Sequence, residues 1–317
     1  MLSRVADSLY WMSRYLERAE HTARLTDTNL NLMLDQSPEA AKRRWSRVLN
    51  SLHHPTPEAA AEPYEVAQRL AFDLHNPSSV VSSIMTAREN SRQVREQISS
   101  EMWEQLNRLF HEVKRADMDN VWDAEPHEFL RAVTEGIHLF QGVTDSTMTH
   151  GEGWQFIQFG RYIERASNVA ALLDTSFQDL PIGDEADVAD HGEWIGLLRS
   201  CTAFEAYCHA YTADLRPERI AEFLLLNSEF PHAVRFAADR LKNSLDAIHD
   251  ATQSRHAERV SRLAGRLGAS LGYGQIDEII AGGLHGYLDS IQRQCAQINN
   301  SAYALYVTYP IETAIEA

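Results

Sequence analysis

The segment LYWMSRYLERAEHTARLTD, at residues 9 to 27, returns as FIQFGRYIERASNVAALLD at residues 156 to 174. At this offset of 147, 8 of 19 positions are identical, where average residue usage gives roughly one. The shared positions are Arg14/Arg161, Tyr15/Tyr162, Glu17/Glu164, Arg18/Arg165, Ala19/Ala166, Ala23/Ala170, Leu25/Leu172 and Asp27/Asp174. A second pair of similar segments follows in the same order, since Pro77-Ser-Ser-Val resembles Pro231-His-Ala-Val. The repeat predicts a duplicated helical unit within one domain over 1–317, with halves of about 1–147 and 148–317.

The repeated segment has the pattern of a helix that is buried on more than one side. In each copy an apolar stripe with alternating spacings of three and four residues predicts one buried face, beginning at Leu9 and at Phe156. The Arg-x-x-Glu-Arg cluster falls on the opposite side, where Tyr10 and Ile157 predict that it is covered as well. The cluster is expected to be either a structural ion-pair network or a site for a ligand or partner. These candidate residues, with their adjacent tyrosines, are Arg14, Tyr15, Glu17, Arg18, Arg161, Tyr162, Glu164 and Arg165.

A second cluster of arginines lies in the segment 78–110, which is predicted to be one helix. One stripe of this segment is apolar, and Arg88, Arg92 and Arg95 line a neighbouring face one turn apart. Guanidinium groups at this spacing suit a carboxylate or phosphate bound by paired hydrogen bonds. Glutamates in the same segment are close enough to neutralise them, so an anion site and a structural scaffold remain alternatives. With Asn90, these arginines complete the candidate ligand-binding residues.

Three long motifs resemble the bacterial alpha-E family. They are MLSRVADSLYWMSRYLERAE at residues 1 to 20, ARENSR through QISSEMWEQLN at residues 87 to 107, and FPHAVRF at residues 230 to 236. The resemblance covers essentially the whole chain and implies an all-α bundle. Through the family's genomic company it also implies partners: a circularly permuted ATP-grasp amidoligase, a transglutaminase-like peptidase and a proteasome-like hydrolase.

The two copies of the motif are not equally complete. Ser167 and Ala171 of the second copy stand where Glu20 and Arg24 stand in the first. A site built on the motif is therefore expected to be fuller in the first half.

Two functional classes follow. The first is an accessory or interaction protein that works with the amidoligase in peptide or amide-bond metabolism and binds a carboxylate or peptide. The second is a stand-alone enzyme with Glu17 or Glu164 as general base and the arginines as a carboxylate clamp, so that Glu17, Arg18, Glu164 and Arg165 are the candidate catalytic residues. The first is preferred, because the sequence has no recognisable nucleophile arrangement, metal set or cofactor loop.

Composition supports a helical protein of the cytoplasm. Apolar residues make up 44%, and 10 prolines and 15 glycines in 317 residues favour long helices over turn-rich sheet. No long uncharged apolar stretch predicts a membrane span, and three cysteines without paired spacing fit a reducing compartment. The net charge of −16 argues against nucleic-acid binding.

Neither metal nor cofactor is expected. Glu135-x-x-His138 and Glu229-x-x-His232 have the spacing of di-iron sites in helical bundles, but such a site needs two further glutamates. Pro231 also interrupts the second pair.

The expected helices cover residues 2–34, 39–53, 64–74, 78–110, 127–147, 151–175, 192–212, 217–227, 231–250, 255–268 and 276–303. Outside them, we expect an exposed linker at 179–190, a loop at 267–274 and an extended tail at 303–309.

Overall fold

The computed structural model describes residues 1–33, 38–55, 62–123, 126–180, 188–212, 214–252 and 258–307. Within these ranges the protein is helical and has no strand, which confirms the predicted all-α fold. None of the described helices is both long and apolar enough to cross a membrane.

The first half of the chain contains seven described α-helices. They are α1 (Ser3–Met33), α2 (Pro38–Ser51), α3 (Pro63–Ala71), α4 (Val80–Gln93), α5 (Ser100–Arg115), α6 (Met118–Asp123) and α7 (Pro126–Thr147). The second half contains eight: α8 (Glu152–Asp179), α9 (Val188–Ser200), α10 (Phe204–Tyr211), α11 (Pro217–Leu226), α12 (Val234–Thr252), α13 (Glu258–Tyr273), α14 (Ile276–Gly282) and α15 (Leu284–Tyr306).

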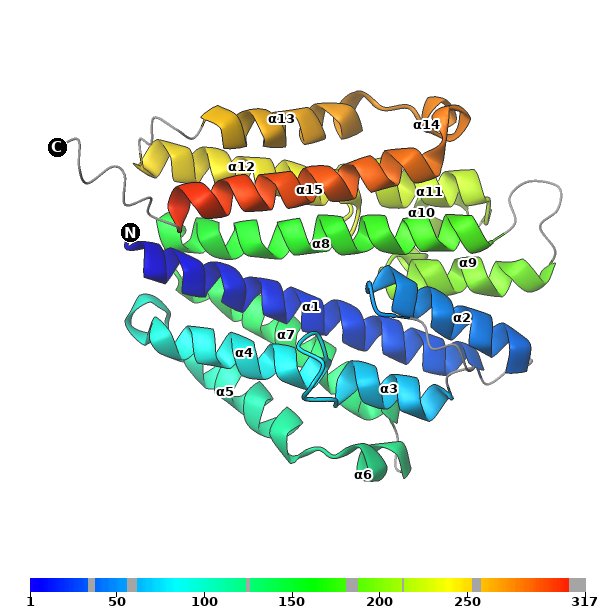
Figure 1. Ribbon diagram of the computed structural model, residues 1–317, viewed down its shortest axis with the longest axis horizontal. Helices are drawn as coiled ribbons and strands as arrows, with labels where there is room; N and C mark the ends of the chain where they lie inside the picture. Colours follow the sequence, from blue (N-terminus) through cyan, green and yellow to red (C-terminus); the bar gives the residue numbers. More distant parts are fainter. Residues whose placement is uncertain are drawn as a thin grey trace.

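The two repeated segments form the long helices α1 and α8, which lie side by side through the middle of the molecule (Figure 1). They run in the same direction, since the amino group of Met1 bonds to Glu152 at one end and the seam residues follow in register. Gly160 allows a close approach, because a Cβ there would lie 2.4 Å from the carbonyl oxygen of Tyr10. Opposite it, Ser13 Oγ donates to the carbonyl of Ile157 at 2.6 Å. The two central helices are therefore packed almost backbone to backbone.

Each central helix carries a similar set of neighbours. In the first half α4 and α7 pack on α1, and α5 packs on both of them. In the second half α12 and α15 pack on α8, and α13 packs on both of them. Figure 1 shows these two groups on opposite sides of the α1/α8 pair. The order of contacts is what a duplicated unit would give, and the superposition of residues 1–147 on 148–317 stays a prediction.

The prediction of a single helix over 78–110 is wrong. Helix α4 ends at Gln93, a 3-10 turn covers Arg95–Gln97, and α5 begins after Ser99. Ser99 has extended backbone and its hydroxyl accepts from the amide of Met102 at 3.1 Å, as an N-cap does. Arg95 therefore does not continue the face of α4.

Two other long helices are broken where the backbone turns left-handed. The helix expected over 192–212 divides into α9 and α10 at Thr202, which has φ 51°. The helix expected over 276–303 divides into α14 and α15 at Gly283, where φ is 99°. Glycine adopts this conformation at little cost, whereas threonine does so only under the constraint of its surroundings.

The remaining differences lie at helix ends. The loop expected at 267–274 is wrong, because α13 continues to Tyr273. The prediction of an extended tail over 303–309 is wrong for its first residues, because α15 runs to Tyr306. Residues 308–309 lie outside the described residues. Helices α8 and α9 cover both ends of the expected linker at 179–190, while 181–187 also lie outside the described residues. The short helix α6 was not predicted.

Candidate functional site

The two copies of the Glu-Arg motif meet face to face and exchange ion pairs. Glu164 of α8 accepts from Arg14 Nε at 2.6 Å and from Arg18 Nε at 2.7 Å. In return, Glu17 of α1 accepts from Arg165 Nη2 at 2.8 Å. The Glu17 and Arg165 side chains are each only 2% exposed. These reciprocal pairs form the Glu-Arg seam, which consists of Arg14, Glu17, Arg18, Arg161, Glu164 and Arg165.

The electrostatics of the seam favour charged, paired groups. Burial acts to raise the pKa of Glu164, but Arg14 and Arg18 outweigh it and hold that pKa below its usual range. Burial acts to lower the pKa of Arg165, and Glu17 reverses this effect and raises it. A carboxylate with a low pKa and two bound guanidinium groups is a poor proton acceptor. This arrangement does not favour Glu164 as a general base.

The first copy extends the seam with a further buried ion pair. Arg24 bonds to Glu20, which is fully buried, and Glu20 also contacts His138 Nε2 of α7 at 3.2 Å. Burial opposes ionisation of Glu20, yet Arg24 and its other neighbours lower its pKa to about 2. His232 Nδ1 lies 3.5 Å from the Arg24 guanidinium, and burial holds the pKa of His232 well below its usual value. The additional charges of the first half are thus taken up by internal partners.

Arg14 and Arg161 are equivalent in the repeat but have different surroundings. Arg14 bonds to Glu164, and its Nη1 also donates to Tyr10 and to Asn299 at 3.1 and 3.0 Å. Arg161 lies 3.8 Å from the nearest oxygen of Glu17, and its buried Nε has no hydrogen-bond partner in the described chain. Burial lowers the pKa of Arg161. One arginine of the equivalent pair is satisfied, and the other is not.

Two aligned positions differ around this pair of arginines: Tyr10, which accepts from Arg14, is replaced by Ile157 in the second copy, and Trp11 is replaced by Gln158. Trp11 of the first copy covers Arg14, with its ring 4.7 Å from the guanidinium carbon, and packs edge-on against Tyr303 of α15. At the offset of 147 the second copy has Gln158 in this place. Gln158 has no aromatic ring to pack over Arg161.

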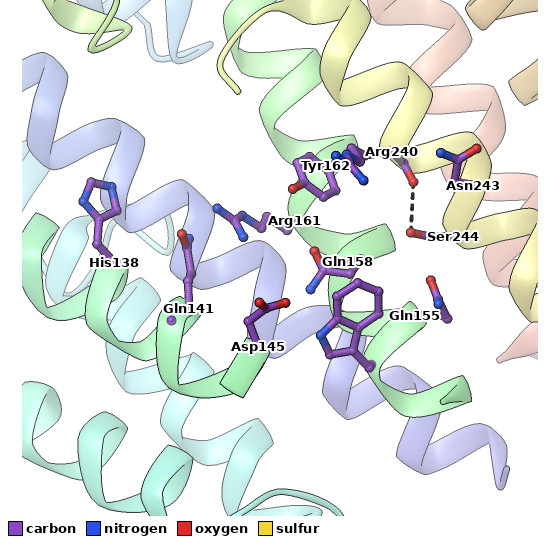
Figure 2. A pocket seen from close by; sticks show the side chains of 12 residues that line it. His138, Gln141, Asp145, Gln155, Gln158, Arg161, Tyr162, Arg240, Asn243 and Ser244 are labelled. Carbon is purple, nitrogen blue, oxygen red and sulfur yellow. Dashed lines mark hydrogen bonds between the residues drawn. The ribbon is translucent and has the colours of Figure 1, made fainter. Parts of the chain in front are cut away.

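A polar cavity of about 560 Å³ opens beside Arg161, between α7, α8 and α12 (Figure 2). Gln158 is 7% exposed and lines this cavity, and its side chain makes no hydrogen bond within the described part of the chain. Trp154 also lines it, and its buried Nε1 is likewise without a partner there. Further side chains that line the cavity are Gln141, Asp145, Gln155, Arg240, Asn243 and Ser244. Unsatisfied buried donors are costly, and two of them, Arg161 Nε and Trp154 Nε1, belong to residues that line this cavity.

The tyrosines of the motif pack against arginines. Arg18 lies over the ring of Tyr15 at 5.3 Å, and Arg161 over the ring of Tyr162 at the same distance. Tyr162 also lines the cavity, whereas Tyr15 packs against Trp11. The structure therefore brings six of the twelve candidate residues into the Glu-Arg seam and packs two more, Tyr15 and Tyr162, against its arginines. Arg161 and Tyr162 also line the cavity.

The arginines of the 78–110 segment do not join this site. Arg92 bonds to Glu89 on the exposed surface. Arg88 bonds to an asparagine of α5 and lies over aromatic rings, while Arg95 lies over the ring of Trp103 at 5.6 Å. Asn90 donates to a backbone carbonyl of its own helix. None of these four candidates lines the cavity beside Arg161.

Sequence reasoning did not identify the α12 residues of the cavity or His138 as part of it. Arg240 and Asn243 lie in α12 beyond the end of the FPHAVRF motif, so no local signal marked them. His138 was considered only with Glu135, which points to solvent with 72% exposure, whereas its actual partner is Glu20. In the described residues no group of three or more His, Cys, Asp or Glu side chains is arranged to hold a metal ion.

Comparisons with known proteins identify the family. The chain is 25% identical over 313 residues to uncharacterized proteins of Mycobacterium bovis and of one Mycobacterium tuberculosis strain. A protein of a second Mycobacterium tuberculosis strain is 24% identical over the same length. These matches cover 90% of the chain but 34% of each relative, so the chain spans about a third of the length of the curated relatives it matches. No solved structure matches the chain. The model of Alpha-E, described as a predicted alpha-helical domain with a conserved ER motif, matches residues 1–307, and the chain therefore belongs to the Alpha-E family.

Proposed function

We propose that this protein binds a small peptide or amino-acid derivative through its carboxylate, in the cavity beside Arg161, and presents it to an ATP-grasp amidoligase. The observation that supports this most directly is the contrast between Arg14 and Arg161. The same motif is sealed by Trp11 in one half and opens onto a polar cavity at Gln158 in the other.

The cavity has the chemistry for such a ligand. Arg161 and Arg240 both line it, and neither has a carboxylate within hydrogen-bond distance in the described chain. Guanidinium groups bind carboxylates by paired, charge-assisted hydrogen bonds. The carboxamides of Gln141, Gln155 and Asn243 can donate to and accept from peptide groups. A volume of about 560 Å³ lies in the usual range for small-ligand sites.

An accessory role fits the site better than independent catalysis. Glu17 and Glu164 are held in ion pairs across the seam, so they are poorly placed to accept a proton from a substrate. The longer mycobacterial relatives contain the matching segment within a much larger chain. The circularly permuted amidoligase that the family resemblance implies is the proposed principal partner, and the proposed location is the cytoplasm. A transglutaminase-like peptidase and a proteasome-like hydrolase are the further partners.

Calorimetric titration tests the binding proposal. The probes are N-acetyl-alanyl-alanine with a free carboxylate, the same dipeptide as its C-terminal amide, and inorganic phosphate. We expect the free carboxylate to bind and the amide to bind at least about tenfold more weakly, since one hydrogen bond to a charged group contributes about 1.5–3 kcal/mol. Equal binding of acid and amide would contradict the carboxylate site, and tighter binding of phosphate would assign the cavity to another anion.

The partner proposal has its own test. The amidoligase of the same host is assayed with this protein, without it, and with the Arg161→Gln variant. An increase in ligation rate only in the wild-type mixture supports the accessory role. Ligation or hydrolysis by this protein alone would instead establish an enzyme.

A further inference from the structure

A second cation-rich cavity, of about 460 Å³, lies between α1, α7 and α9. Arg24, Arg131 and Arg199 line it. Arg24 is bound to Glu20, but Arg131 is 69% exposed and lies 3.9 Å from the equally exposed Glu135. Arg199 lies over a phenylalanine ring and forms no ion pair in the described chain. Two of the three guanidinium groups are thus available to an anion.

Both cavities are lined by the same face of α7. Thr134 and Arg131 line the second cavity, whereas His138, Gln141 and Asp145 line the first. These residues recur at spacings of three and four, which places them along one side of the helix. At 1.5 Å per residue, the face from Arg131 to Asp145 is about 21 Å long.

A single buried carboxylate joins the two cavities. Glu20 bonds to His138, which lines the first cavity, and to Arg24, which lines the second. His138 is 46% exposed, so its ring also faces outward between the two sites. The two cavities therefore adjoin one another along α7 and are not isolated features of opposite surfaces.

We propose that the two cavities are subsites for one extended acidic peptide, which lies along α7 with its C-terminal carboxylate at Arg161 and Arg240 and an acidic side chain at Arg131 and Arg199. This inference rests on the proposed function, because it takes the first cavity as the carboxylate site. An extended chain covers at most about 3.3–3.6 Å per residue, so about six residues span the 21 Å face. In a protein with a net charge of −16, two neighbouring sites with available arginines select an anionic peptide by charge.

The experiment compares two six-residue peptides, N-acetyl-Glu-Gly-Ser-Gly-Ser-Gly and the same sequence with Gln at its first position. Both have a free C-terminal carboxylate and differ only in the acidic side chain. They are titrated calorimetrically against the wild-type protein, Arg161→Gln, the double variant Arg131→Gln/Arg199→Gln, and Arg266→Gln as a control. Arg266 is exposed on α13, away from both cavities.

We expect the Glu peptide to bind about tenfold more tightly than the Gln peptide, because two exposed ion pairs each contribute up to about fivefold. The double variant should remove this difference and leave the Gln peptide unaffected, while Arg266→Gln should change neither. Equal binding of both peptides to the wild-type protein would overturn the inference but not the proposed function. Failure of both peptides to bind would overturn the two together. If the Glu peptide depends on Arg131 and Arg199 but not on Arg161, the cavities are separate sites and the inference is wrong.

Discussion

The same substitution at two equivalent positions should give opposite results. Arg14→Gln removes the partner of Glu164 and the donor to Tyr10 and Asn299. Breaking a buried ion pair costs about 3–5 kcal/mol. The Arg14 side chain is 16% exposed and Arg18 still binds Glu164, so we expect the low end, about 3 kcal/mol.

Arg161→Gln removes a guanidinium that has no close carboxylate, 3.8 Å being the nearest approach, and whose charge burial already disfavours. Its free energy of unfolding should stay within about 1 kcal/mol of wild type. The two variants are compared by urea unfolding followed by circular dichroism, with an unchanged m-value as the check that the same surface unfolds.

For peptide binding, we expect Arg161→Gln to have the larger effect and Arg14→Gln the smaller one. Arg14→Gln keeps the cavity and should bind N-acetyl-alanyl-alanine like the wild type, whereas Arg161→Gln should lose at least about tenfold in affinity. Equal losses of stability, or a larger loss for Arg161→Gln, would refute the contrast between a sealed and an open copy of the motif.

Further tests address the seam and the central helix contact. Arg165→Ala should lower the free energy of unfolding by about 3–5 kcal/mol, because it leaves the buried Glu17 without its partner, while the double variant Glu17→Leu/Arg165→Met should lower it less. Unfolding midpoints equal to that of the wild type would place the pair on a solvated surface. Burial lowers the pKa of His21 to about 3, so its contribution to stability is full above the usual histidine pKa of 6.5 and is lost as pH drops toward 3, by up to about 1.4 kcal/mol per pH unit. In unfolding experiments at stepped pH, His21→Gln should reduce the slope of stability against pH. An unchanged slope would show that another group causes the pH dependence. Gly160→Ala should destabilise the fold by about 1–3 kcal/mol, because the added Cβ meets the backbone of Tyr10. Gly265→Ala on α13, which has open space around it, should instead stabilise the fold by about 0.5–1 kcal/mol. Similar effects of the two substitutions in thermal melts would contradict the close contact between α1 and α8.

Much of the fold could be predicted because the two central helices carry strong local signals. The segment Ser3–Met33 contains neither glycine nor proline, and its apolar stripe has the period of a helix. Apolar residues on the charged side, such as Tyr10 and Ile157, indicated that this face is covered, and both are buried. The breaks at Thr202 and Gly283 were missed, because periodicity continues through a single left-handed residue.

The candidate site could be predicted only in part. The repeat marked the seam, because Glu17 and Glu164 stand at equivalent places between arginines. It could not show which arginine each glutamate binds, since that depends on how α1 and α8 pack. Arg240 comes from α12, and only the tertiary fold brings it to Arg161. The aligned repeat shows that Gln158 replaces Trp11. Only the structure shows that the ring of Trp11 covers Arg14, and this contact gives the replacement its consequence for Arg161.

The most direct test of the open cavity is Gln158→Trp, which copies the sealed half of the molecule without removing a charge. The measurement is calorimetric titration with N-acetyl-alanyl-alanine, alongside Gln297→Trp, an exchange at an exposed position of α15. Because the indole fills space next to Arg161 as Trp11 does next to Arg14, we expect a folded protein with undiminished thermal stability and no measurable binding, while Gln297→Trp binds normally. A folded Gln158→Trp variant that binds the peptide as tightly as the wild type would contradict the account.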